Sequence, residues 1–276
     1  MKVKFPDTVK TKAEKFDWLH ENHDDILYAK KNELKEVDIS GGFDFIDSGK
    51  SVAEKGEFKG KEAGVLEVKV IINTTNIRDS HKDVHFPGIW NKTLKENKRL
   101  KHVQEHAMTF DKIIADKDDL KAYVETFIWK ELGFDFSGKT EALVFESKVR
   151  ESRNANMYKE YKDGNVDNHS VSMIYVKIKF AMDSDESEHK AYKATYDEYI
   201  DEIANKEVVE KDGYFWAVFE AKAREGSAVV DGSNFVTPTL SSREKHSEES
   251  GRSKAEENSL SNDNQAYLNA VKEILT

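Results

Sequence analysis

The chain has 276 residues and a formal net charge of −10, with 53 acidic and 43 basic side chains and no cysteine. The absence of cysteine excludes disulfide frameworks, cysteine-ligated zinc or iron–sulfur sites and thiol nucleophiles. The acidic balance argues against nonspecific nucleic-acid binding, and because the sequence shows no apolar stretch of membrane-spanning length and no signal peptide, we expect a soluble intracellular protein.

Residues 1–64 are predicted to form a helical lead-in followed by glycine-containing loops. Apolar residues recur at helical spacing over residues 1–36, and glycines recur from Gly41 to Gly64. The main domain, residues 65–240, is predicted to begin with a strand at 65–72, where apolar and charged residues alternate. A short helical pattern follows Pro87, and a second strand is predicted at 123–129.

The second half of the main domain is predicted to contain one long helix and three strands. Residues 139–161 are mostly polar and contain no proline, and their apolar residues recur at helical spacing. This pattern predicts a surface helix. Strands are predicted at 169–182 and 214–223, with a third, short strand at 228–230. Because strands and helices alternate without a repeated βαβ period, we predict an α+β or barrel-like domain rather than a Rossmann-type sheet.

Two segments differ from the rest in composition. The insertion at 183–212 has eleven acidic and four basic residues, with apolar residues spaced for a helix. Residues 241–262 lack aromatic side chains and are predicted to be a disordered linker, and 263–276 to be a C-terminal helix. Outside the insertion and residues 241–276, the chain has 34 basic and 35 acidic residues, so its acidity lies in these two segments.

Two constellations of side chains indicate possible chemistry. His81 and His85 are four residues apart, as are His102 and His106, and such pairs on a helix can chelate one metal ion. A histidine-ligated metal hydrolase is therefore one alternative. The other is nucleophilic catalysis by Ser170, whose hydroxyl needs an imidazole as base and a further group to orient that imidazole. His106 and Glu225 are the candidates for these two roles.

Four sequence blocks follow one another in the main domain. They are DVHFPGIW at 83–90; LKHVQEH at 100–106 with IIA at 113–115; DG at 163–164 leading to HSVSM at 169–173; and AREGSAVV at 223–230 with GSN at 232–234 and TPT at 237–239. The order and the residues of these blocks resemble those of the phage prohead (capsid-maturation) serine proteases, which are distantly similar to herpesvirus assemblins. The resemblance spans about residues 65–240.

The resemblance implies a fold, an activity and partners. The fold would be α+β, with a small, mostly antiparallel β-barrel surrounded by helices. The activity would be peptide-bond hydrolysis with Ser170 as nucleophile, His106 as base and Glu225 as the third residue, without metal or organic cofactor. The substrates would be the scaffold protein, the N-terminal segment of the major capsid protein and the protease itself, inside an assembling procapsid in the host cytoplasm. An oligomer is possible, and neither nucleic acid nor membrane is an expected partner.

One departure from the family pattern leaves alternatives open. Family members usually have glycine two residues after the nucleophile, where this chain has Ser172. Ser172 is therefore a rival nucleophile, and a catalytically inactive internal scaffold or assembly protein of the same fold is an alternative function. Glu225 either orients His106 or is a structural carboxylate that holds the backbone turns at Ser227 and Asn234.

Two further histidines of these blocks, His102 and His169, are predicted to have no catalytic role. His102 is expected at the surface. His169 precedes Ser170 on a predicted strand, so its side chain is expected on the opposite face.

Overall fold

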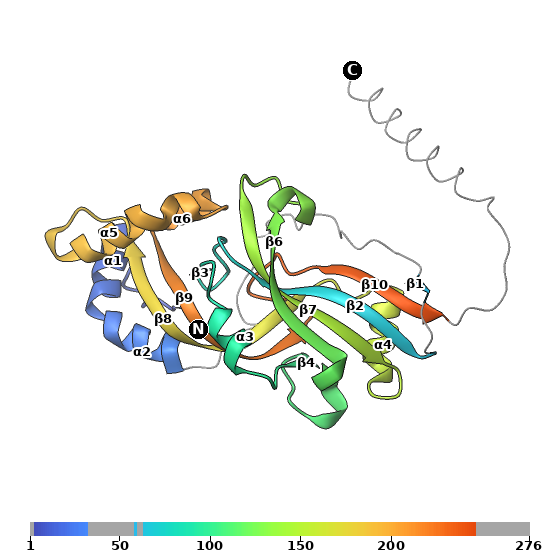
Figure 1. Cartoon of the computed structure of the whole chain (residues 1–276). Coiled ribbons are helices and arrows are strands. Elements are labelled where there is room, and N and C mark those ends of the chain that lie inside the picture. The colour runs from blue at the N-terminus through green and yellow to red at the C-terminus, as the bar shows by residue number, and fades with distance from the viewer. Residues whose placement is uncertain (1–2, 33–57, 60–62, 247–276) are drawn as a thin grey trace, which may run out of the picture. The chain divides into compact units, whose positions relative to one another are not determined.

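The computed structural model describes residues 3–32, 58–59 and 63–246, which form an α+β domain (Figure 1). One sheet has the strand order β1 (Phe58–Lys59), β10 (Thr239–His246), β2 (Val65–Thr74), β7 (Lys139–Arg150) and β6 (Leu120–Ile128). In the other, β9 (Tyr214–Ala228) pairs with β8 (His169–Met182) along one side and with β3 (Asp83–His85) and β4 (Lys101–Gln104) along the other, and β5 (Ile113–Asp116) follows β4. The α+β class is confirmed, whereas the described strands pair as two sheets and no closed barrel is detected among them.

Six α-helices accompany the sheets in the described part of the chain. They are α1 (Lys12–Glu21), α2 (His23–Asn32), α3 (Asn91–Glu96), α4 (Ala155–Asp163), α5 (Lys190–Tyr199) and α6 (Lys206–Asp212). Figure 1 shows α1, α2, α5 and α6 gathered around one end of the β8–β9 pair. Side chains alternate between the two faces of a strand, so Trp216 packs with Phe16 of α1 on one face, while Phe215 packs with Tyr196 of α5 on the other.

The main hydrophobic core joins the two sheets. It includes Val68 and Phe145 from the first sheet and Val171 and Met173 from β8. Gly226 of β9 faces the same core, where a Cβ atom would lie 2.6 Å from Phe145 Cε2 and 2.9 Å from Ile72 Cγ2. Glycine is therefore the residue that lets β9 approach the first sheet this closely.

Helix α2 is anchored to the second sheet by a buried ion pair. Lys30, in its last turn, forms an ion pair with Asp83 of β3, and both side chains are fully buried. The Tyr175 hydroxyl of β8 donates to the second carboxylate oxygen of Asp83 at 2.8 Å. The Lys30 ammonium also lies 5.4 Å from the centre of the Trp216 ring. These contacts fix the N-terminal helices against the β8–β9 pair.

The predicted surface helix at 139–161 is wrong. Residues 139–150 form the strand β7, which pairs with β2 on one side and β6 on the other, and α4 begins only at Ala155. Because β7 is central and covered on both faces, Ala142–Phe145 is a continuous buried run, which also fits helical spacing. Asn154 separates the two elements, since its side chain accepts a hydrogen bond from the Met157 amide and caps α4.

Three further boundaries differ from those predicted or fall outside the described residues. Strand β9 continues to Ala228, so residues 228–230 are not a separate strand. Strand β10 pairs with β2 and extends to His246, so the predicted linker begins within a sheet. Most of the glycine-containing segment, the rest of the linker and the predicted helix at 263–276 lie outside the described residues.

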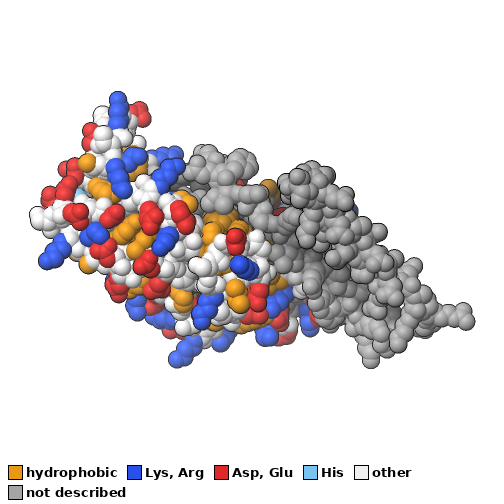
Figure 2. Space-filling view, turned by 90° about the horizontal axis from the view of Figure 1, so that it is seen from above, with side chains coloured by type: hydrophobic (Ala, Val, Ile, Leu, Met, Phe, Trp, Pro, Cys, Tyr) orange, Lys and Arg blue, Asp and Glu red, His pale blue; other side chains and the backbone are white. Residues whose placement is uncertain are grey.

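The described surface has mixed charge. On the face seen in Figure 2, acidic and basic side chains are interspersed, with small hydrophobic areas between them. None of the helices in the described residues is both long and apolar enough to cross a membrane.

Replacing Lys30 by methionine should destabilise the domain by about 3–5 kcal/mol, because the Asp83 carboxylate would stay buried without its cation. The measurement is the free energy of unfolding from urea denaturation. The matched control is Lys95→Met, since Lys95 is exposed in the last turn of α3 and has the same side chain. Equal losses in the two variants would show that the Lys30–Asp83 pair does not anchor α2.

Candidate functional site

His106 lies in a tight turn directly after β4. This strand runs parallel to β9, with Gln104 opposite Ala228, and the Glu105 amide donates to the Ala228 carbonyl at 2.9 Å. Glu105 and His106 both have left-handed backbone conformations, with φ of 51° and 56°. Such conformations are uncommon for residues other than glycine and cost about 1–2 kcal/mol each. The turn brings the His106 side chain back to Glu225 of β9.

The imidazole of His106 is held by the carboxylate of Glu225. Nδ1 of His106 donates to one Glu225 oxygen at 2.6 Å, and the side chains are only 7% and 1% exposed. Ser227 Oγ donates to the other oxygen at 2.7 Å and accepts the His106 amide hydrogen at 3.0 Å. Asn234 instead bonds to Thr74. Glu225 is thus placed to orient His106, while Ser227, which sequence reasoning took for a turn residue, is bonded to both.

The second ring nitrogen of His106 is open to accept a proton. Because a carboxylate only accepts hydrogen bonds, Nδ1 must carry a hydrogen, and in the neutral ring Nε2 then has the lone pair. Nε2 is buried and has no hydrogen-bond partner among the described residues. A buried, unpaired acceptor is unusual in a folded protein, and a catalytic role is one of the explanations for such an atom.

Both candidate nucleophiles lie beside Glu225 and Ser227. In the antiparallel β8–β9 pair, Ser170 is opposite Ser227 and Ser172 is opposite Glu225, so these four side chains share one face. The register shifts immediately after Ser172, an irregularity that is common next to active sites. Ser170 is 9% exposed and Ser172 1% exposed. Neither is hydrogen-bonded to His106, and Ser172 Oγ has no partner among the described residues.

A second polar network connects β4 and β8 beside the serines. His102, predicted at the surface, is fully buried. Its Nδ1 lies 2.9 Å from Ser147 Oγ and its Nε2 lies 3.1 Å from the Tyr161 hydroxyl. The same hydroxyl lies 2.9 Å from Nε2 of His169, whose Nδ1 lies 2.8 Å from the Thr237 carbonyl oxygen. Tyr161 therefore links the strand that precedes His106 to the strand that carries Ser170.

The hydrogen-bond directions in this network follow from the carbonyl at its end. A carbonyl only accepts, so His169 donates from Nδ1 to Thr237 and accepts at Nε2 from Tyr161, whose oxygen then accepts from His102. Burial lowers the pKa of His169 to about 4 and the pKa of His102 well below 6.5. Both histidines are therefore neutral near pH 7, and every ring nitrogen has a partner.

The structure does not bring together the four histidines of the metal-hydrolase alternative. His85 lies in β3 and contacts Asn73 and Tyr175, whereas His102 and His106 belong to the networks described above. Neither pair lies on a helix. Among the described residues His81 has metal-ligand neighbours in Asp79 and Asp83, but the Lys30 ammonium already pairs with Asp83.

A cavity of about 410 Å³ lies elsewhere on the second sheet. Its walls are formed by β8, β9 and two flanking helical residues, namely Lys31, Val176, Lys177, Ile178, Lys179, Tyr199 and Phe219. It contains none of the candidate catalytic residues.

Comparison of the chain with protein-family models, with curated proteins and with solved structures found no match. The family resemblance consequently rests on the four sequence blocks.

The ring signals of His102 and His169 should not titrate between pH 5.5 and 8, because burial holds their pKa below this range. The folded state then binds fewer protons than the unfolded state as the pH falls from 6.5 toward 4, so these two residues favour unfolding in acid. The measurement is the NMR chemical shift of the imidazole C–H groups as a function of pH. A midpoint near 6.5 for either ring would contradict the neutral network.

Proposed function

We propose that the chain is a serine endopeptidase in which Ser170 is the nucleophile, His106 the general base and Glu225 the residue that orients His106. The observation that carries this proposal is the His106–Glu225 hydrogen bond of 2.6 Å, which leaves Nε2 of His106 buried and unpaired beside the β8–β9 pair. An imidazole whose Nδ1 hydrogen is fixed by a carboxylate is the arrangement that activates a serine hydroxyl.

The reaction would proceed through an acyl-enzyme. Ser170 Oγ attacks the scissile carbonyl carbon while Nε2 of His106 takes the hydroxyl proton, and Glu225 stabilises the imidazolium. The imidazolium then gives this proton to the leaving amine as the peptide C–N bond breaks. A water molecule, deprotonated by the same Nε2, attacks the acyl-enzyme ester, and Ser170 recovers its proton as the acid product leaves.

Two features support catalysis over a purely structural role for this pair. Backbone strain at two successive residues places His106 against Glu225, and strained conformations cluster at active sites. Ser227 occupies the second oxygen of Glu225 and the amide of His106, so the carboxylate cannot rotate away without breaking these bonds. The pair is thus held before any substrate arrives, as electrostatic preorganisation requires.

The substrate and the setting follow from the resemblance to prohead proteases. The substrates would be the scaffold protein and the N-terminal segment of the major capsid protein, together with the protease itself, within an assembling procapsid in the host cytoplasm. A small, mostly antiparallel β-barrel similar to that of the assemblins is likewise part of this proposal and rests on the same resemblance. The mechanism uses no metal or organic cofactor.

Ser172 is the feature that favours two alternatives: Ser172 itself as nucleophile, or an inactive scaffold protein. Its hydroxyl is buried, unpaired among the described residues and opposite Glu225 in the β8–β9 register, so it competes with Ser170 for the role of nucleophile. It also stands where the family usually has glycine, which favours an inactive scaffold of the same fold. The experiment must therefore separate the two serines.

The test is coexpression of the chain with the capsid and scaffold proteins of its phage, followed by mass spectrometry of all three. Ser170→Ala and His106→Ala should each reduce cleavage by at least about 10³-fold, since these residues act as a unit. Ser172→Ala should retain cleavage, and Ser137→Ala, at an exposed serine, is the matched control.

Three results would overturn the assignment. Cleavage that survives Ser170→Ala but not Ser172→Ala would make Ser172 the nucleophile. Cleavage lost only on adding a chelator would indicate a metal hydrolase. The absence of cleavage by the wild-type chain, with capsid and scaffold proteins folded, would indicate a scaffold.

A further inference from the structure

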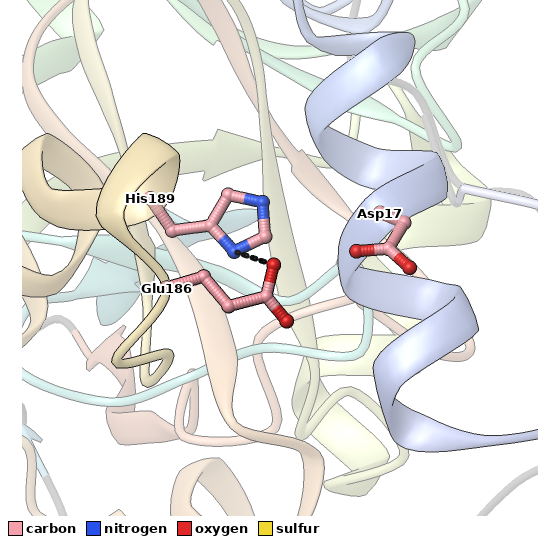
Figure 3. A group of neighbouring side chains, drawn as sticks. All are labelled: Asp17, Glu186 and His189. Carbon is pink, nitrogen blue, oxygen red and sulfur yellow. Dashed lines mark ion pairs between the residues drawn. The ribbon is translucent and has the colours of Figure 1, made fainter.

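Two segments distant in sequence bring metal-ligating side chains together beside α1. Asp17 lies on α1, and Glu186 and His189 lie at the short 3₁₀ helix Ser187–His189 that precedes α5. One ligand atom from each of the three residues lies within 4.8 Å of the other two. Figure 3 shows the Asp17 carboxylate facing the His189 ring from one side and the Glu186 carboxylate beneath that ring.

The His189 ring is buried and its Nδ1 has a hydrogen-bond partner. The residue is 1% exposed, and its Nδ1 lies 2.8 Å from Ser184 Oγ. An Nδ1 hydrogen donated to Ser184 leaves the lone pair on Nε2, the nitrogen that faces α1 in Figure 3. Histidines that bind metals almost always donate their other ring N–H to such an outer partner, which fixes the tautomer.

Within the part of the chain that the structure describes, no basic side chain neutralises the two carboxylates of the cluster. No lysine or arginine within the described ranges forms an ion pair with Asp17 or Glu186, and Glu186 reaches only His189 Nδ1, at 3.8 Å. Tetrahedral ligands at about 2.1 Å from Zn²⁺ are about 3.4 Å apart. Since Asp17 and Glu186 are exposed and free to rotate, small side-chain movements would close the present separations.

A second imidazole, that of His20, lies next to the His189 ring. His20 is three residues after Asp17 on α1, and its ring centre lies 5.0 Å from that of His189. Its Nδ1 is buried and has no hydrogen-bond partner among the described residues, while its Nε2 lies 3.9 Å from Glu188. This buried, unpaired nitrogen is a second unsatisfied group beside His189, independent of the three-residue cluster.

We propose that Asp17, Glu186 and His189 bind one divalent first-row transition metal ion. Mixed imidazole and carboxylate ligands suit Zn²⁺ and, with more oxygen ligands, Mn²⁺. The ion would join α1 to the beginning of the acidic insertion at 183–212. The site shares no residue with the proposed catalytic groups, so its role is separate from peptide hydrolysis.

The test is isothermal titration of ZnCl₂ into the full chain, together with thermal unfolding in the presence and absence of Zn²⁺. Wild type should bind one Zn²⁺ per chain and unfold at a higher temperature when it is bound, because a ligand that binds only the folded state stabilises it. The double variant Asp17→Asn, Glu186→Gln should bind Zn²⁺ more than about 100-fold more weakly, since loss of even an outer-shell partner weakens metal binding by 10–100-fold.

The replaced carboxylates are exposed, so the double variant keeps the buried His189 and its packing. The control is Asp118→Asn, Glu207→Gln, which removes the same charges from exposed positions elsewhere. Wild-type affinity in the control and weak binding in the double variant would support the site. Either no saturable binding of one Zn²⁺ per chain, or equal affinity in both double variants, would overturn it.

Discussion

The arrangement of the candidate site depends on the register of the β8–β9 pair. Ser170 and Ser172 share a face with Ser227 and Glu225, whereas Val171 and Met173 contribute to the main core. A slip of one residue would exchange these two sets, because successive side chains of a strand point to opposite faces. The polar site and the core therefore specify the same register, and Gly226, opposite Val171, lets the core side close.

Polar networks on β4, β8 and β9 position the reacting groups. Glu225 and Ser227 hold His106 in its strained turn. Tyr161 joins His102, four residues before the proposed base, to His169, which directly precedes the proposed nucleophile. Each of these groups is buried, where a hydrogen bond is electrostatically stronger than in water and an unpaired polar atom is costly. In contrast to these paired groups, Nε2 of His106 and Oγ of Ser172 have no hydrogen-bond partner among the described residues.

The sequence predicted those strands whose hydrophobic pattern fits a strand and does not also fit a helix. Residues 65–72 and 169–182 alternate or run apolar between polar boundaries, and both are strands in the structure. The pattern of residues 139–150 predicts a helix although they form a strand, because the apolar residues of a central strand buried on both faces also fit helical spacing. Strands β3, β4 and β5 are three or four residues long and leave too little pattern to be detected.

For the site, the sequence identified Glu225 and His106 as candidates, and the structure places them in contact. It did not identify the role of Ser227, because the strand predicted at 214–223 stops short of Glu225 and Ser227, which share one face of β9 in the structure. The left-handed turn at Glu105 and His106 contains no glycine, so the sequence has no signal that predicts it. The burial of His102 depends on Tyr161 and Ser147, which lie 59 and 45 residues away.

The most direct measurement of the central claim is covalent labelling of the full chain with a fluorophosphonate, which phosphonylates a serine only where a base activates it. We expect one adduct per chain, mapped by peptide mass spectrometry to Ser170 and absent from His106→Ala. An adduct on Ser172, or a Ser170 adduct that forms equally fast without His106, would contradict it.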